Sequence, residues 1–236
     1  MPTLVASYFA ASSTAGDSTS LATTAFTPAN GEVIVVKATT WDTGTASGTP
    51  SGGGLTYTRQ ATAAPGGFNG YVTIFTTVVS GSPGSMTVTL SPPAASSYHA
   101  MVVERWSNAQ LAATPAVSSP ITGNSTDALA TITTTAANSI VTWADVDETS
   151  QNPDPGTGGG HTYRSGAIED GLADGHQSSA SVQYFAYQTA ASAGSQTIGL
   201  LTPTAQKWTM IGIEVQDASG GGPSTPPGAA FMSFFR

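Results

Sequence analysis

The sequence predicts an all-β protein built from two tandem, internally duplicated antiparallel β-sandwich domains of the jelly-roll or immunoglobulin-like kind, followed by an extended C-terminal tail. Three observations lead to this prediction. Short runs of alternating apolar and polar residues lie between clusters of Gly, Pro, Asn and Ser, which is the pattern of half-buried strands and their turns. Only 8% of the 236 residues are charged, too few for salt-bridged helical faces. The second half of the chain also repeats the pattern of the first.

The strands of the first copy follow from this alternation, because side chains on a strand point to opposite faces in turn. Threonine is abundant in them and combines strand propensity with a hydroxyl group that tolerates a solvated face. Turn residues, such as those of Ser80-Gly81-Ser82-Pro83-Gly84, separate the runs. We expect strands near residues 4–9, 20–27, 32–40, 55–62, 71–79, 85–90 and 97–106, and again at the repeated positions.

The repeat appears first in GGLTY at 53–57 and GGHTY at 159–163, which are 106 residues apart. Residues 72–90 align with 182–200 at an offset of 110, as do 98–106 with 208–216. This alignment pairs Phe75 with Phe185, Val103 with Ile213 and Glu104 with Glu214, and it places an insertion in a loop of the second copy. Upstream, residues 30–38 align with 137–145 at an offset of 107. A repeat of this length is the size of a complete β-sandwich.

The predicted domains are residues 1–112, residues 113–218 and a tail of residues 219–236. The tail begins with a Gly/Pro linker, which is typical of a flexible tether. It ends in an apolar cluster, whose exposure to water would be unfavourable by about 1.5 to 3 kcal/mol for each large side chain. We therefore expect the tail to dock onto another chain, or to fold back onto the second domain, through Phe231, Met232, Phe234 and Phe235.

Composition excludes several classes of function. The net charge is −8 and the six Lys and Arg residues are scattered, so the sequence gives no basis for binding nucleic acid. No apolar stretch reaches the ~20 residues of a membrane-spanning helix, and the first residues do not form a secretory signal, so no membrane insertion is expected. There is no cysteine, which rules out disulfides and thiolate metal sites. No cofactor is predicted.

No catalytic motif appears, and we expect no enzymatic activity. A glycosidase needs two carboxyl groups about 5 to 10 Å apart in one cleft. Glu104 and Glu214 occur once in each copy, so they are expected on the solvent face or at the rim of their strands. Asp145 and Asp147 would share one strand face and, with Glu148 and Asp154, could ligate Ca²⁺, although a solvated loop is the favoured interpretation and no metal site is predicted.

Two further groups of residues have ordinary structural explanations. The dipeptides Asp170-Gly171 and Asp174-Gly175 predict turns, with His176 beside the second. Neither His99 nor His161 has a histidine at the aligned position of the other copy, which argues against a paired metal or catalytic role.

Aromatic rings could bind a sugar by stacking on it if they are exposed. Trp41 and Trp106 lack aromatic counterparts in the other copy, so they are the candidates for stacking on a glycan, although packing in the core is the favoured interpretation.

The order of motifs resembles the repeated β-sandwich modules of structural proteins in tailed phages of actinobacteria. The first copy carries LTYTRQAT, YVTIFTTVVSG, SMTVTL and YHAMVVERWSNA, and the second carries HTYRSG, VQYFAYQTA, SQTIGL and WTMIGIEVQDA. The resemblance covers most of residues 17–217 and implies a virion accessory protein, either a minor tail protein or a capsid decoration protein. It implies no transferable catalytic residue.

The expected function is therefore structural. Assembled in the host cytoplasm and then carried on the virion, the protein would bind other virion subunits through its tail, as a symmetric homo-oligomer on the particle, and display its domains during host attachment. Many weak contacts on a symmetric particle would give a durable attachment. The alternative is a carbohydrate-binding module or adhesin that recognises glycans on the host surface.

Overall fold

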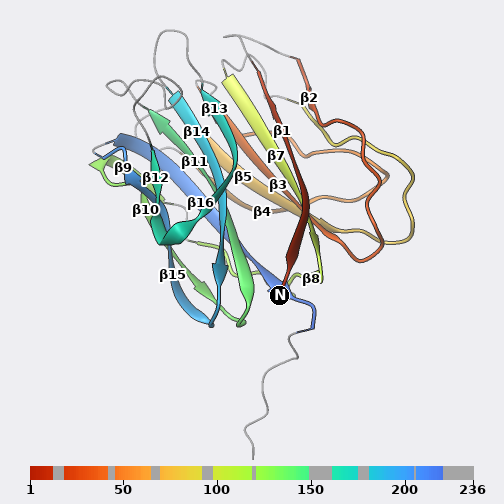
Figure 1. Cartoon of the computed structure of the whole chain (residues 1–236). Helices are drawn as coiled ribbons and strands as arrows, with labels where there is room; N and C mark the ends of the chain where they lie inside the picture. Colours follow the sequence, from red (N-terminus) through yellow and green to blue (C-terminus); the bar gives the residue numbers. More distant parts are fainter. Residues whose placement is uncertain are drawn as a thin grey trace, which may run out of the picture.

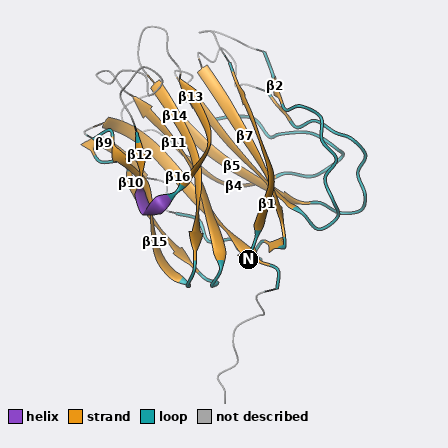
Figure 2. Ribbon diagram, in the orientation of Figure 1, coloured by secondary structure: helices purple, strands orange, loops and turns teal. Residues whose placement is uncertain are grey.

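The fold is taken from a computed structural model, which describes residues 1–12, 19–41, 46–64, 70–91, 98–118, 121–148, 161–174, 181–204 and 206–219. Figure 2 shows that strands dominate this part of the chain, with one short 3₁₀ turn at Arg164–Gly166. The predicted all-β sandwich fold is confirmed. No helix in the described ranges is long and apolar enough to cross a membrane.

The first half of the chain forms one large sheet and one small one. The large sheet has the order β1-β7-β3-β5-β4, and each pair of neighbouring strands in it is antiparallel. Strands β2 and β6 pair separately. The bounds are β1 Thr3–Ala11, β2 Leu21–Ala22, β3 Val33–Trp41, β4 Thr58–Ala63, β5 Tyr71–Val78, β6 Thr89–Leu90 and β7 Tyr98–Ser107.

The second half has a similar plan. Its large sheet has the order β13-β14-β11-β16-β8, and β9 also pairs with β16. A three-stranded sheet of order β10-β15-β12 lies beside it. The bounds are β8 Ala109–Gln110, β9 Ile121–Thr126, β10 Leu129–Thr134, β11 Ser139–Glu148, β12 Thr162–Tyr163, β13 Ile168–Asp174, β14 Ser181–Ala190, β15 Gly194–Thr202 and β16 Gln206–Asp217.

The two large sheets lie against each other in the middle of the molecule. Figure 1 shows β2 on one outer side and β10, β12 and β15 on the other. A middle core joins both halves, since Val35 and Ile74 of the first pack with Ala144 and Ile211 of the second. Each half has in addition an outer core between its large and small sheets. Each large sheet is therefore covered on both faces.

This double cover explains why β3 is buried along its whole length, with no alternation between exposed and buried residues. Sheets that are covered on both faces have continuous apolar strands, and β3 begins Val33-Ile34-Val35-Val36. The strand therefore carries even its one lysine, Lys37, into the interior.

The predicted strands are confirmed in place, with some differences in extent. The run expected at 20–27 is a strand only at Leu21–Ala22, and the run expected at 85–90 only at Thr89–Leu90. A single bridge between Phe26 and Met86 continues that pairing. The turn predicted at Asp170-Gly171 is wrong, because both residues lie within β13.

The alignment at an offset of 110 needs a correction. Phe75 faces the outer core of the first half, whereas Phe185 faces the middle core. Val103 and Ile213 differ in the same way. Because neighbouring side chains point to opposite faces, a shift of one residue exchanges the faces. An alignment that matches the faces of these strands must therefore have an offset that differs from 110 by an odd number of residues, such as one.

Candidate functional site

Three charged side chains meet inside the middle core. The ammonium of Lys37 lies 2.9 Å from Oε1 of Glu104 and 2.8 Å from both carboxyl oxygens of Asp170. The side chains are 0%, 0% and 2% exposed, respectively. Lys37 and Glu104 belong to the first half and Asp170 to the second, so the cluster links the two halves. We call these three residues the buried charge cluster.

Neighbouring strands place Lys37 and Glu104 on the same face of the first large sheet. Lys37 lies in β3 opposite Val102 of β7, and Val35 lies opposite Glu104. The two charged residues are therefore diagonal neighbours, within reach of long side chains. Lys37 also lies 5.9 Å from the ring centre of Phe185, which belongs to the facing sheet.

A β-bulge places Asp170. The pairing of β13 with β14 shifts between Glu169 and Gly171, so Asp170 is the extra residue. Bulges redirect side chains and are frequent beside active sites. Gly171 follows directly, and a Cβ atom there would lie 2.5 Å from Cγ2 of Val102. The absence of a side chain at this position lets β13 approach β7 closely.

Glu104 accepts hydrogen bonds through both of its carboxylate oxygens. The hydroxyl of Thr142 donates to Oε1 at 2.7 Å, and Nε1 of Trp106 donates to Oε2 at 3.0 Å. Burial opposes the ionisation of Glu104, but the charge of Lys37 and the hydrogen bonds outweigh it, and they hold its pKa below the ordinary value. Glu104 is therefore the ionised carboxylate of the cluster.

Asp170 differs from Glu104 in its protonation. Burial raises the pKa of Asp170 well above its ordinary value, and the nearby charge of Glu104 raises it further, against the effect of Lys37. One ammonium cannot neutralise two buried carboxylates, so a retained proton on Asp170 leaves the cluster neutral. The middle core thus holds an ammonium, a carboxylic acid and a carboxylate in direct contact.

The structure overturns the prediction for the two glutamates. The expectation that Glu104 and Glu214 lie on a solvent face or at a rim is wrong, because they are 0% and 1% exposed. Glu214 accepts hydrogen bonds from the backbone of Thr135 and Ala136, at 3.0 Å, and so fixes the turn before β11. Glu104 therefore belongs to the buried charge cluster, whereas Glu214 holds a turn of the second half.

Trp41 and Trp106 are also buried, at 6% and 1% exposure, and both belong to the middle core. This burial agrees with packing in the core and leaves neither ring open for stacking on a glycan. Trp106 packs edge-on against Tyr187, with ring centres 5.2 Å apart, while its indole N–H binds Glu104. Their lack of aromatic counterparts in the other half reflects packing between the halves.

Asp145 and Asp147 lie on one face of β11, as predicted, and both are fully buried. No side chain in the described ranges bonds the carboxyl group of Asp145. Burial raises its pKa well above the ordinary value, against the smaller effect of backbone hydrogen bonds from Val146 and Thr209. No group of three or more metal-ligating side chains gathers in the described ranges. The side chain of Glu148 and all of Asp154 lie outside the described residues.

The histidines have separate surroundings. His99 is buried, and its Nε2 lies 3.1 Å from the carbonyl oxygen of Thr19. Nε2 of His161 lies 2.6 Å from Oε2 of Glu169, and the same oxygen accepts a hydrogen bond from Tyr163. Sequence reasoning missed this surface group. His176 lies outside the described residues.

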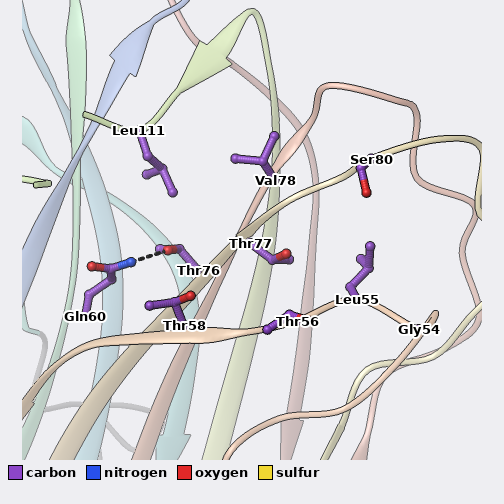
Figure 3. A pocket seen from close by; sticks show the side chains of 10 residues that line it. All are labelled: Gly54, Leu55, Thr56, Thr58, Gln60, Thr76, Thr77, Val78, Ser80 and Leu111. Atoms are coloured by element: carbon purple, nitrogen blue, oxygen red, sulfur yellow. Dashed lines mark hydrogen bonds between the residues drawn. The ribbon is translucent and has the colours of Figure 1, made fainter. Parts of the chain in front are cut away.

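A surface hollow of about 400 Å³ lies beside β4 and β5. Figure 3 shows its lining, in which Gln60 donates a hydrogen bond to Thr76. The lining is rich in threonine and includes no charged or aromatic side chain. The hollow therefore offers a ligand hydroxyl groups, one amide and a few apolar side chains.

The predicted docking residues Phe231, Met232, Phe234 and Phe235 lie outside the described residues, as does most of the tail.

Comparison with protein-family models, with curated proteins and with solved structures finds no match for this chain.

Proposed function

We propose that this chain is a non-enzymatic structural protein of a tailed-phage particle, either a minor tail protein or a capsid decoration protein. It binds other virion subunits through its C-terminal tail and displays its β-sandwich layers outward. The order of motifs in the two halves of the sequence supports the phage assignment. The observation that carries the structural role is the middle core, which joins both halves into one stack of sheets.

The use of charge in the described residues supports the same role. The buried charge cluster bridges the two halves, and Arg105 binds Glu32 through two nitrogen atoms at 2.8 and 2.9 Å within the first half. Buried pairs of this kind fix the relative positions of the strands that carry them. A stack fixed in this way suits a displayed part of a particle, which must keep its shape without a bound substrate.

The tail is the proposed anchor. A Gly/Pro tether that ends in Phe231, Met232, Phe234 and Phe235 presents apolar side chains for burial against another chain. Repetition of such an anchor on a symmetric particle raises the overall affinity without a large single interface.

The test compares the full chain with a chain that ends at Ala218, by light scattering and by co-sedimentation with virions of the source phage. We expect only the full chain to associate. A second variant replaces the three tail phenylalanines by serine, and its matched control replaces Ser224 and Thr225 of the tether by alanine. Loss of association in the serine variant, together with its retention in the alanine control, would identify the aromatic cluster as the anchor.

Two outcomes would contradict the proposal. Equal association of the full and shortened chains removes the anchor role of the tail. Free monomers in both cases, together with binding on a glycan array, would instead identify a carbohydrate-binding module or adhesin.

A further inference from the structure

The buried charge cluster contains the three groups that amide formation requires. These are an amine on Lys37, a carboxyl carbon on Asp170 and a proton acceptor on Glu104. All three are removed from water, which would otherwise solvate the amine and carboxyl groups. Both carboxyl oxygens of Asp170 lie 2.8 Å from Nζ of Lys37.

This geometry places the reacting atoms close together. Because Nζ is equally distant from the two oxygens, the carboxyl carbon between them lies about 3 Å away, within the range of a reactive arrangement. The contact joins residues 133 positions apart in the sequence. Both partners are held by their surroundings. Lys37 lies within a fully buried strand, and Asp170 lies in a bulge. The close approach of Gly171 to Val102 positions that bulge.

We propose that Lys37 and Asp170 become joined by an intramolecular amide bond between Nζ and Cγ, with Glu104 as the catalytic proton acceptor. The bond would be a covalent link between β3 of the first half and β13 of the second. This inference concerns a modification of the chain itself and does not depend on the phage assignment.

The step balances in atoms and charge. The Lys37 ammonium gives one proton to Glu104, and the free amine attacks Cγ of protonated Asp170. The new C–N bond forms a tetrahedral intermediate, and Nζ loses a second proton, which Glu104 relays to the departing hydroxyl group. The C–O bond breaks and one water leaves. The products are the neutral amide, water and protonated Glu104, and no oxidant or other reactant is needed.

The surroundings favour each part of this step. Burial raises the pKa of Asp170, and so supplies the carboxylic acid, whose hydroxyl group leaves more readily than an oxide ion. Thr142 and Trp106 donate hydrogen bonds to Glu104 and hold its carboxylate beside Nζ. Formation of the amide also removes a buried ammonium and a buried carboxylate, which are costly to keep in an apolar interior.

The first experiment measures the intact mass of the full, denatured chain by mass spectrometry. We expect a mass below that of the sequence by one water, and faster migration on a denaturing gel than for the variant Lys37→Arg, which keeps the charge but cannot form this bond. Tryptic digestion is expected to yield one branched peptide that contains both Lys37 and Asp170.

A control separates the amide from dehydration within the chain. Asp170 precedes Gly171, and such a pair can lose water to form a cyclic imide, which hydroxylamine cleaves. The branched peptide is expected to survive hydroxylamine and to be missing from Lys37→Arg. The variant Asp170→Asn offers a second chemical test, because the same bond would then form with loss of ammonia in place of water.

Glu104→Gln tests the proton acceptor. We expect it to retain the full sequence mass while it keeps the strand signal in circular dichroism. A folded wild-type chain with the full sequence mass and no branched peptide would overturn the proposal and leave the cluster as an ion pair only. Since this result comes from the wild-type chain, it decides the question even where a variant fails to fold.

Discussion

Two buried carboxyl groups on facing sheets, Glu104 and Asp145, have opposite surroundings. Both are 0% exposed. Glu104 accepts hydrogen bonds from Lys37, Thr142 and Trp106, and its pKa is held below the ordinary value. In the described part of the chain no side chain bonds Asp145, and burial raises its pKa against the smaller effect of backbone hydrogen bonds from Val146 and Thr209. The comparison shows that the partners of a buried acid, and not its depth, decide whether it is charged.

The largest effect is expected from removal of the shared cation. Lys37→Met leaves Glu104 and Asp170 buried without Nζ, whether that nitrogen is an ammonium or the proposed amide. Loss of one partner from a buried ion pair alone typically costs about 3 to 5 kcal/mol. We expect a loss of stability of that order in urea unfolding. Lys207→Met, the same change in a partly exposed residue, serves as the control. Similar losses in both variants would contradict the role assigned to the cluster.

The opposite effect is expected for Asp145, the acid without a side-chain partner. Because the pKa of Asp145 is raised in the folded state, folding favours its protonated form. Its contribution to stability is therefore largest below the pKa of the unfolded chain and declines as the pH rises towards the raised value. Asp145→Asn removes this decline, and at pH 7 we expect the variant to be more stable than the wild type.

The measurement for Asp145→Asn is thermal unfolding as a function of pH. The two curves are expected to converge below about pH 3, where Asp145 is protonated even in the unfolded chain. A variant that is less stable than the wild type at pH 7 would show that the carboxylate of Asp145 has a partner that stabilises its charge.

A smaller loss is expected where the bulge meets the first half. Gly171→Ala places a methyl group 2.5 Å from Cγ2 of Val102, so β13 must move away from β7. Overpacking of this kind costs about 1 to 3 kcal/mol. Gly84→Ala, with no atom within 4 Å of the added methyl group, is the matched control. Equal melting temperatures for the two variants would contradict the close approach.

The smallest effect is expected for an exposed pair. Arg164 lies 3.1 Å from Asp127, whose side chain is 52% exposed. Exposed ion pairs contribute about 0 to 1 kcal/mol, since water already solvates both charges. Asp127→Asn should therefore change the midpoint of urea unfolding very little. A loss of stability as large as that of Lys37→Met would show that burial does not explain why the buried charge cluster and an exposed ion pair differ in their contribution to stability.

The strands could be predicted from the sequence because alternation and turn residues are local signals. The buried charge cluster could not, because Lys37 and Asp170 are 133 residues apart and meet only when two sheets pack. Asp170-Gly171 has the composition of a turn, yet the pairing of β13 with β14 makes it a bulge. One signal was available: the run Val33 to Val36 lacks alternation, which indicates a strand covered on both faces and therefore a buried Lys37.

The shared middle core has a consequence during synthesis of the chain. The first large sheet is complete once Ser107 has emerged from the ribosome, but its middle face is covered only after β16, which ends at Asp217, has followed. At about 5 to 20 residues per second, this interval is on the order of ten seconds. During that time Lys37 and Glu104 lie on an open apolar surface, where their charges oppose premature association with neighbouring nascent chains.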